Sequence, residues 1–317
     1  MVCEALVAEL TDEDEVGRRI LAWDGDPAPL ADNVPLRIVG ALNALVRAGR
    51  VPYLAMHYPP RAAPEAGQLA APLRRTLQEH ADEVLAFLAR PPQTNEVGRS
   101  AILIGGLLTI AAQTGLPLAL HEIGASAGLN LVPDRYRYRL GEVSWGPPHA
   151  KLLLEPRWSG ASPPIDAPLR VIARRGCDRN PIDIGTSAER ERLTAYVWPD
   201  QPARLARLSA AIEAALADRV AVERADAAEW IERDFAPRSG ITQVLFHSVV
   251  WGYLAAETRE RIQSCLTRVG ASARADAPIA WLRFEIPGQL RLTLWPGGSE
   301  QVLANAHPHG EWIEWLG

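Results

Sequence analysis

Residues 118–129 read LALHEIGASAGL and carry the strongest local signal in the chain. The mostly apolar run has the length of a buried strand, and glycines at 124 and 128 bracket a turn of small residues. A strand followed by such a turn and then by a helix places backbone N–H groups and the positive helix end beside a ligand. We therefore expect a strand, a ligand-binding loop and a helix at this point.

The loop does not match the two common phosphate-binding motifs. A P-loop requires a lysine directly after its last glycine, but Leu129 follows Gly128. A dinucleotide fingerprint requires glycines where Ser126 and Leu129 stand. The carboxylate of Glu122 would also repel a pyrophosphate. A ligand that carries an ammonium group and no phosphate fits this acidic residue better, and S-adenosylmethionine is such a ligand.

The same loop matches GxSxG, the nucleophile elbow of α/β-hydrolases, with Ser126 as the nucleophile. Asp226 or Asp276 as the acid, and His307 or His309 as the base, follow in the order that this fold uses. Those hydrolases place several strands before the elbow, whereas the preceding part of this chain reads as helical. We keep a serine hydrolase as an alternative.

The part of the chain before the loop is predicted to be helical. Apolar residues recur at three-to-four spacing over 34–46 and 69–88, which is typical of helices that pack on one face. The apolar run 101–120 is long enough to span a membrane. Because polar residues and Pro117 interrupt it, we interpret it as a buried helix followed by a buried strand.

After the loop, apolar strands alternate with helices. Such alternation is typical of a parallel sheet that helices cover on both faces. Two further apolar segments flank Pro296–Gly298 and predict an antiparallel hairpin. We expect strands over 169–174, 220–224, 242–250 and 279–285, and helices over 187–197, 203–217, 227–235 and 257–269.

The expected fold class is α/β, with a Rossmann-like, mostly parallel sheet that ends in an antiparallel hairpin. The 317 residues are enough for more than one domain. We divide them into an N-terminal helical region, residues 1–95, and an α/β domain, residues 96–317, with an insertion at about 130–168.

Composition and charge exclude several classes of protein. The net charge of −5 disfavours a protein that binds nucleic acid by neutralising phosphates. Three widely spaced cysteines predict neither a disulfide framework nor a zinc site, and His307 and His309 lack a further ligand at metal-binding spacing. The acidic start of the chain lacks the basic region of a signal peptide. We expect a cytoplasmic protein without a metal and without a nucleic-acid or membrane partner, and we leave its oligomeric state open.

Several short motifs together resemble a bacterial family of unknown function. They are HEIGASAGLN at 121–130, DRNPID at 178–183, VWPDQ at 197–201, FHS at 246–248 and AHPHG at 306–310. The core of that family is similar to the class I S-adenosylmethionine-dependent methyltransferases. The resemblance covers most of the chain and implies a methyltransferase-type sheet.

The resemblance implies roles for particular residues. Glu122 would attract the ammonium group of S-adenosylmethionine, and Asp178, or Asp183 in its place, would hold the ribose hydroxyls. His247 stands at a strand end and is the candidate catalytic base, because the ordinary pKa of histidine lies near neutrality. The candidate cofactor-binding residues are Glu122, Gly124, Ser126, Gly128, Asp178, Asp226 and Ala227, the last two at the adenine.

The first function hypothesis is methyl transfer from S-adenosylmethionine to an unknown small-molecule or protein acceptor. The second is a non-catalytic ligand-binding or scaffold protein on the same fold, and the third is the serine hydrolase. One spacing departs from the expected pattern. About fifty residues separate Gly128 from Asp178, where a spacing near twenty is usual for the comparable fingerprint.

Overall fold

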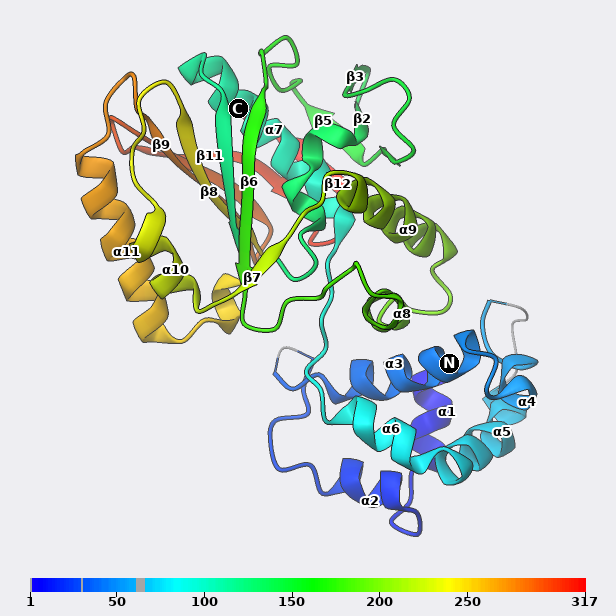
Figure 1. Cartoon of the computed structure of the whole chain (residues 1–317). Coiled ribbons are helices and arrows are strands. Elements are labelled where there is room, and N and C mark those ends of the chain that lie inside the picture. Colours follow the sequence, from blue (N-terminus) through cyan, green and yellow to red (C-terminus); the bar gives the residue numbers. More distant parts are fainter. Residues whose placement is uncertain (1, 30, 61–65) are drawn as a thin grey trace. The chain divides into compact units, whose positions relative to one another are not determined.

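The computed structural model describes residues 2–29, 31–60 and 66–317, and Figure 1 labels most of its helices and strands. The chain forms two compact units. The first comprises Met1–Thr94 and Gly185–Ala206, and the second comprises Asn95–Ile184 and Arg207–Gly317. The segment 185–206 therefore belongs to the first unit, although it lies between two strands of the second in the sequence.

The first unit is helical and has its own apolar core. Asn43 ties the segment 185–206 into it, because its buried amide donates to the carbonyl oxygens of Ala195 (3.0 Å) and Val197 (2.9 Å). The helices are α1 Val2–Glu9, α2 Glu15–Leu21, α3 Val34–Arg47, α4 Pro52–Ala55, α5 Ala66–Glu79, α6 Ala81–Leu88 and α8 Ser187–Ala195. Helix α9, Pro202–Ala217, spans the boundary between the two units.

The single helix expected over 69–88 is in fact two helices, α5 and α6. His80 leaves the helical conformation, with φ −123° and ψ 29°. Leu69, Leu73 and Leu77 on α5 and Val84 and Leu88 on α6 all enter the same core. The turn at His80 therefore lets both apolar stripes face one interior.

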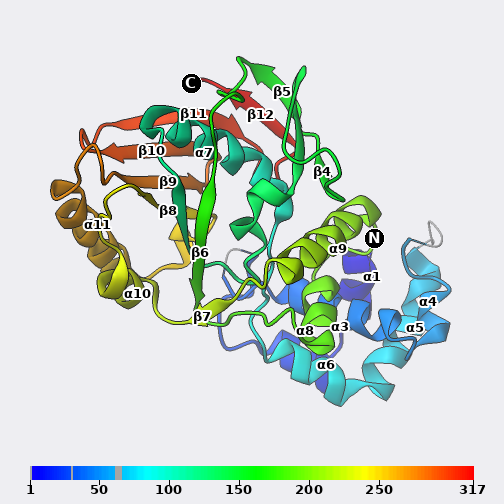
Figure 2. The same cartoon turned by 45° about the horizontal axis from the view of Figure 1, so that its top comes forward.

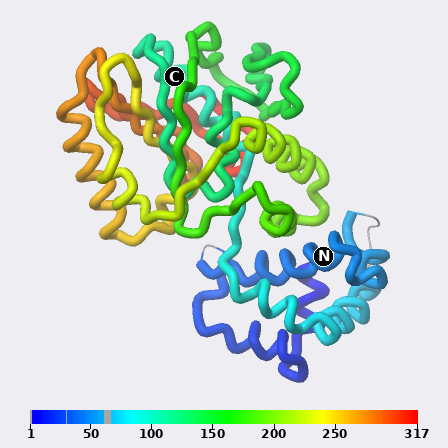
Figure 3. The backbone as a smooth tube through the Cα atoms, viewed as in Figure 1, coloured from blue at the N-terminus to red at the C-terminus, as the bar shows by residue number. Residues whose placement is uncertain are grey.

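The second unit is built on a nine-stranded sheet in the order β5-β12-β11-β10-β9-β8-β1-β6-β7. Its central strands β7, β6, β1, β8 and β9 are parallel. Strands β10, β11 and β12 continue from β9 as an antiparallel meander, which Figure 2 shows, and Figure 3 traces the backbone of the whole chain. The bounds are β1 Leu118–Ile123, β5 Arg157–Gly160, β6 Val171–Asp178, β7 Val222–Arg224, β8 Thr242–Ser248, β9 Ile279–Glu285, β10 Gln289–Trp295, β11 Glu300–Ala306 and β12 Trp312–Trp315.

This sheet confirms an α/β fold with a mostly parallel centre and antiparallel strands after it. The expected hairpin is part of a longer meander, since β12 adds to β11 and β5 pairs with β12 in parallel. The strand expected over 279–285 is β9 with the same bounds. The sequence pattern did not indicate β5 or β12.

Helices lie on both faces of the sheet (Figure 2). Leu282 of β9 contacts α7, Ser100–Thr114, so closely that a Cβ on Gly106 would lie 2.5 Å from its side chain. The neighbouring residue Trp281 points to the opposite face, where it packs with α10, Ala227–Asp234, and α11, Ala256–Ala271. Helix α7 therefore covers one face, and α10 and α11 cover the other.

The apolar run that could span a membrane by length and composition is the core helix α7 together with the short helix η1, Val97–Arg99, before it. Its most apolar window is 72% buried inside the structure. The helix ends at Gly115, which adopts a left-handed conformation with φ 65°, and β1 follows. This agrees with the prediction of a buried helix followed by a buried strand.

The segment between β1 and β6 forms a small sheet of its own. Strand β2, Arg137–Leu140, pairs with β3, Val143–Trp145, and with β4, Leu153–Leu154. Tyr136 and Tyr138 of this segment are fully buried. Strand β5 follows the small sheet in the sequence and forms the edge of the large one.

Candidate functional site

The loop after β1 is held in a left-handed path. Gly124, Ser126 and Gly128 have φ values of 65°, 53° and 73°. The Ala125 N–H donates to the carbonyl oxygen of Cys177 (3.0 Å) and the Gly128 N–H to that of Ala125 (2.7 Å). A Cβ on Gly124 would lie 2.4 Å from the Val250 side chain, so glycine is required there for packing as well as for its backbone conformation.

The helix expected directly after this loop is absent from the described structure. The chain instead enters two 3-10 turns, η2 Leu129–Leu131 and η3 Pro133–Arg135. Gly128 is left-handed and Pro133 removes a backbone donor, so an α-helix cannot start at the loop and continue. The positive end of a helix therefore does not contribute to ligand binding here, and the side chains around the loop must supply the recognition.

Glu122 is the most unusual of these side chains. It lies at the carboxyl end of β1, is 2% exposed, and its Oε2 atom makes no hydrogen bond with any described residue. Burial, followed by the charge of Asp178, raises its pKa well above the ordinary value, although the Arg99 charge and a hydrogen bond with Asn130 oppose this. The carboxyl group therefore holds its proton well above the pH at which an exposed glutamate ionises.

The structure brings Asp178 to the same loop. Its Oδ2 accepts from the Ser126 N–H (2.9 Å) and its Oδ1 accepts from the Asn180 N–H (2.8 Å). The carbonyl oxygen of Ser126 accepts in turn from the Ile182 N–H (3.0 Å). Asp178 therefore joins the end of β6 to the loop after β1. The fold brings Asp178 close enough to Glu122 for its charge to raise the pKa of Glu122, although the two motifs are far apart in the sequence.

Asp226 and Ala227 lie after β7, where α10 begins. Asp226 is the N-cap of α10: its Oδ1 accepts from the backbone N–H groups of Ala228 and Glu229, and its Oδ2 pairs with Arg179 (2.9 Å). Burial raises the pKa of Asp226, but these hydrogen bonds outweigh it and hold the pKa below its ordinary value. Ala227 is buried at the first position of the helix.

His247 is fully buried and both of its ring nitrogens are engaged. The Trp281 indole N–H donates to Nε2 (3.1 Å), so the ring proton resides on Nδ1, which donates to Glu285 (2.7 Å). Trp251 stacks on the ring at a centroid distance of 5.2 Å. In this arrangement neither nitrogen is available to take a proton from a substrate.

Two polar residues near Glu122 were not among the candidate site residues. Arg99 donates from Nη1 to the carbonyl oxygen of Ser248 (3.1 Å) and from Nε to that of Pro308 (2.9 Å). Asn130 accepts from the buried Ser100 hydroxyl (2.6 Å). Arg99 is one of many arginines in the chain and Asn130 follows the loop, so only the folded structure shows that both surround Glu122.

Comparison with models of known protein families identifies the family of this chain. The model of a family described as "Uncharacterized protein conserved in bacteria (DUF2332)" matches residues 1–315. The chain belongs to DUF2332. This confirms the resemblance to a bacterial family of unknown function. Comparisons of the DUF2332 chain with curated proteins and with solved structures found no match.

The hydrolase residues of this DUF2332 protein do not form a triad. The buried Ser126 hydroxyl has no hydrogen-bond partner among the described residues. Asp276 pairs with Arg274 and accepts from Ser239. His307 faces Glu311 and His309 faces Glu96. In the described ranges, no three His, Cys, Asp or Glu side chains are placed to hold a metal ion.

We expect Ser126→Ala to change the free energy of unfolding of the DUF2332 protein by less than about 1 kcal/mol, since removing an unpartnered buried hydroxyl breaks no hydrogen bond. We also expect the native protein to resist a fluorophosphonate, because no base among the described residues is hydrogen-bonded to the hydroxyl to activate it. Urea unfolding and intact-protein mass spectrometry measure these two outcomes. Stoichiometric labelling of the native protein that disappears in Ser126→Ala would instead establish the hydrolase.

Proposed function

We propose that this protein binds S-adenosylmethionine at the loop after β1 and transfers its methyl group to a small-molecule or protein acceptor. The single observation that carries the proposal is the buried Glu122 carboxyl group at the end of the central strand, whose Oε2 lacks a partner among the described residues. Leaving such a group unpaired costs about 1–3 kcal/mol. An ammonium N–H from a ligand would supply the missing hydrogen bond.

The order of the parallel strands supports this location. Numbered by their rank in the chain, β7-β6-β1-β8-β9 read 3-2-1-4-5, which is the order of a doubly wound sheet. In such sheets ligands bind outside the carboxyl ends of the strands, where the strand order reverses. That point lies between β1 and β8, beside Glu122. The antiparallel β10 and β11 stand where the expected hairpin follows the fifth strand, and the argument for the location of the site rests on the order of the five parallel strands.

The residues around the loop could contact the three polar parts of S-adenosylmethionine, which are its ammonium group, its ribose and its adenine. Glu122 would accept from the ammonium group, and an ammonium ion beside it would favour the ionised carboxylate. Asp178, which accepts from the backbone N–H groups of Ser126 and Asn180, would lie beside the ribose hydroxyls. Asp226 and Ala227, at the start of α10, would meet the adenine. When bound, S-adenosylmethionine supplies an electrophilic methyl group on its sulfonium sulfur.

One observation favours a non-catalytic ligand-binding protein as the second candidate. His247, the candidate base at the end of β8, has both nitrogens engaged by Trp281 and Glu285. A methyl acceptor that is already nucleophilic would need no base. A ligand-binding protein would bind the cofactor and its demethylated product without turnover.

Calorimetric titration of the full chain with S-adenosylmethionine and S-adenosylhomocysteine tests the proposal. We expect micromolar dissociation constants and, for Glu122→Ala, a loss of about 1–3 kcal/mol, which is the contribution of a hydrogen bond to a charged group. Asp226→Asn should weaken binding less, because it keeps an oxygen for capping α10. Asp276→Asn, a change at an exposed carboxylate away from the loop, is the matched control.

Absence of binding to either compound, with native folding verified by circular dichroism, would reject the cofactor site. Equal affinities of the Glu122→Ala variant and the parent protein would reject the role of Glu122. Binding without methyl transfer to any acceptor in a cell extract would favour the non-catalytic candidate.

A further inference from the structure

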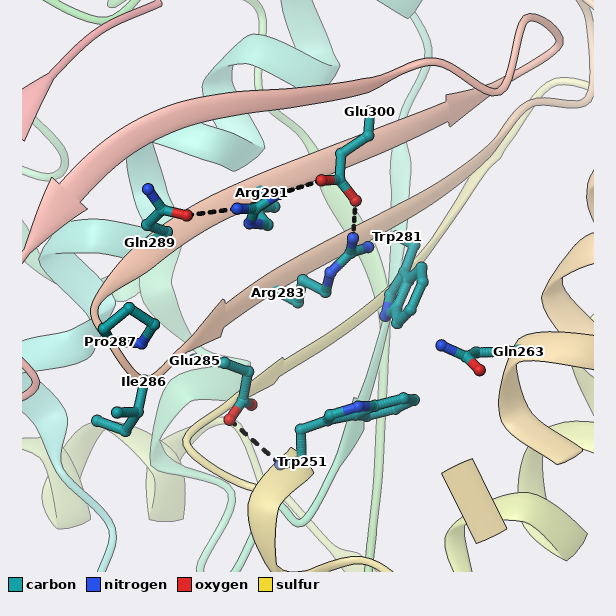
Figure 4. A pocket seen from close by; sticks show the side chains of 10 residues that line it. All are labelled: Trp251, Gln263, Trp281, Arg283, Glu285, Ile286, Pro287, Gln289, Arg291 and Glu300. Carbon is teal, nitrogen blue, oxygen red and sulfur yellow. Dashed lines mark hydrogen bonds and ion pairs between the residues drawn. The ribbon is translucent and has the colours of Figure 1, made fainter. Parts of the chain in front are cut away.

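A pocket of about 400 Å³ opens on the sheet face opposite α7, over β9 and β10 (Figure 4). Trp281, Arg283 and Glu285 of β9 and Gln289 and Arg291 of β10 form its floor. Trp251, in the short helix η4 Trp251–Tyr253, and Gln263 of α11 line its sides. Its volume lies in the range of small-molecule sites.

Two guanidinium groups share this floor. Arg283 and Arg291 are direct cross-strand partners on β9 and β10. Like charges at such positions repel each other. Glu300 on β11 pairs with both arginines, and Gln289 accepts from Arg291. The Glu300 carboxylate at the edge of the pocket therefore forms ion pairs with both cations.

Arg283 has a donor that this arrangement leaves unused. Its side chain is 17% exposed, and its Nη1 atom is buried and makes no hydrogen bond with any described residue. Burial, followed by the charge of Arg291, lowers its pKa to about 10, so the group is still a cation at neutral pH. A buried cationic donor without an acceptor favours an anion beside it.

Glu285 also faces the pocket, but its oxygens are already committed. They accept from His247 Nδ1 (2.7 Å) and from the backbone N–H groups of Val250 (3.0 Å) and Trp251 (3.2 Å). Figure 4 shows Glu285 turned toward Trp251 and away from Arg283, whereas Glu300 is turned toward both arginines. Neither glutamate therefore supplies an acceptor to Arg283 Nη1.

Indole rings line the side of the pocket next to the arginines. The Arg283 guanidinium lies 3.9 Å from the centre of the Trp281 ring, and the rings of Trp251 and Trp281 are 5.6 Å apart at 54°. Such rings present flat apolar surface to a ligand and interact well with a second aromatic ring. The pocket thus combines a cationic donor that has no acceptor, Arg283 Nη1, with aromatic walls.

We propose that this pocket binds a small organic carboxylate that carries a flat ring. A monoanion supplies the acceptor that Arg283 Nη1 lacks and adds only one negative charge beside Glu285 and Glu300, whereas a phosphate dianion would add more. The two oxygens of a carboxylate also match the fork of N–H donors on a guanidinium. This inference is independent of the methyltransferase proposal and holds whether or not the loop after β1 binds a cofactor.

Fluorine NMR of the full chain with 4-fluorobenzoate tests the inference. We expect line broadening and a shift that saturate with a dissociation constant of about 1 mM or below, which is ordinary for a ligand of this size. The neutral isostere 4-fluorobenzamide should bind at least tenfold more weakly because it lacks the charge. Inorganic phosphate, added as an unlabelled competitor of 4-fluorobenzoate, should also bind at least tenfold more weakly because it lacks the ring.

Variants locate the binding. Arg291→Met, at a side chain 38% exposed, should fold normally and weaken binding about tenfold or more, as loss of a charged hydrogen bond does. Arg283→Lys keeps the charge but removes the unmet Nη1 donor and should also weaken binding. Arg274→Met, at an exposed arginine before β9, should leave binding unchanged. Equal binding of benzoate and benzamide, or an affinity unchanged in both pocket variants, would overturn the inference.

Discussion

Glu285→Ala is expected to lower the free energy of unfolding by about 3–5 kcal/mol. The carboxylate accepts from three donors, the His247 ring and the backbone N–H groups of Val250 and Trp251, and alanine supplies no acceptor for any of them. Each buried donor that loses its partner costs about 1–3 kcal/mol, and water that enters the new space offsets part of the sum. Urea unfolding followed by tryptophan fluorescence measures the loss.

Two further variants make the result specific to this carboxylate. Glu285→Gln keeps one acceptor oxygen but turns an amide donor toward backbone donors, so we expect an intermediate loss. Glu142→Ala, at an exposed glutamate in the turn after β2, should change stability by no more than about 0.5 kcal/mol. If Glu285→Ala unfolds at the same urea concentration as Glu142→Ala, the three-donor network does not stabilise the fold.

Glu122→Gln should become more stable relative to the parent protein as the pH rises. Burial and the neighbouring Asp178 raise the pKa of Glu122 in the folded state. Between its ordinary value of 4.5 and the raised value, the unfolded chain is ionised at this residue while the folded chain holds the proton. Folding then costs more at higher pH, and glutamine removes that cost.

The size of the effect follows from linkage. Within that window the parent protein loses about 1.4 kcal/mol of stability per pH unit through Glu122, and the loss levels off above the raised pKa. Unfolding free energies of both proteins at several pH values from 5 to 8 measure the difference, with Glu142→Gln as the exposed control. A stability difference that is constant across this range would show that Glu122 ionises normally in the folded protein.

The sequence pattern predicted single helices and strands better than it predicted how they group into units and sheets. The run 101–120 and the strands near 242–250 and 279–285 were found because their apolar residues are continuous and local. Strand β5 was missed, since Arg157–Gly160 is short and polar and becomes a strand only through pairing with β12. The segment 185–206 reads as an ordinary helical connection, and only long-range contacts such as those of Asn43 join it to the first unit.

At the candidate site, too, the sequence predicted single residues but not the contacts between them. The motif at 121–130 indicated Glu122, and the resemblance indicated Asp178, although no spacing rule placed the two side by side. The contacts of His247 with Glu285 and Trp281 depend on the register of β8 against β9, which sequence periodicity does not contain. The hydrogen-bond partners of the His247 ring nitrogens therefore could not be predicted from the sequence pattern.

Strand β5 has a consequence for how the chain is made. Its partner β12 lies about 150 residues further along the sequence. A ribosome that adds about 5–20 residues per second needs on the order of ten seconds or more to complete that interval. During this time the nascent β5 has no strand to pair with, so formation of the outer edge of the large sheet should be a late step of co-translational folding.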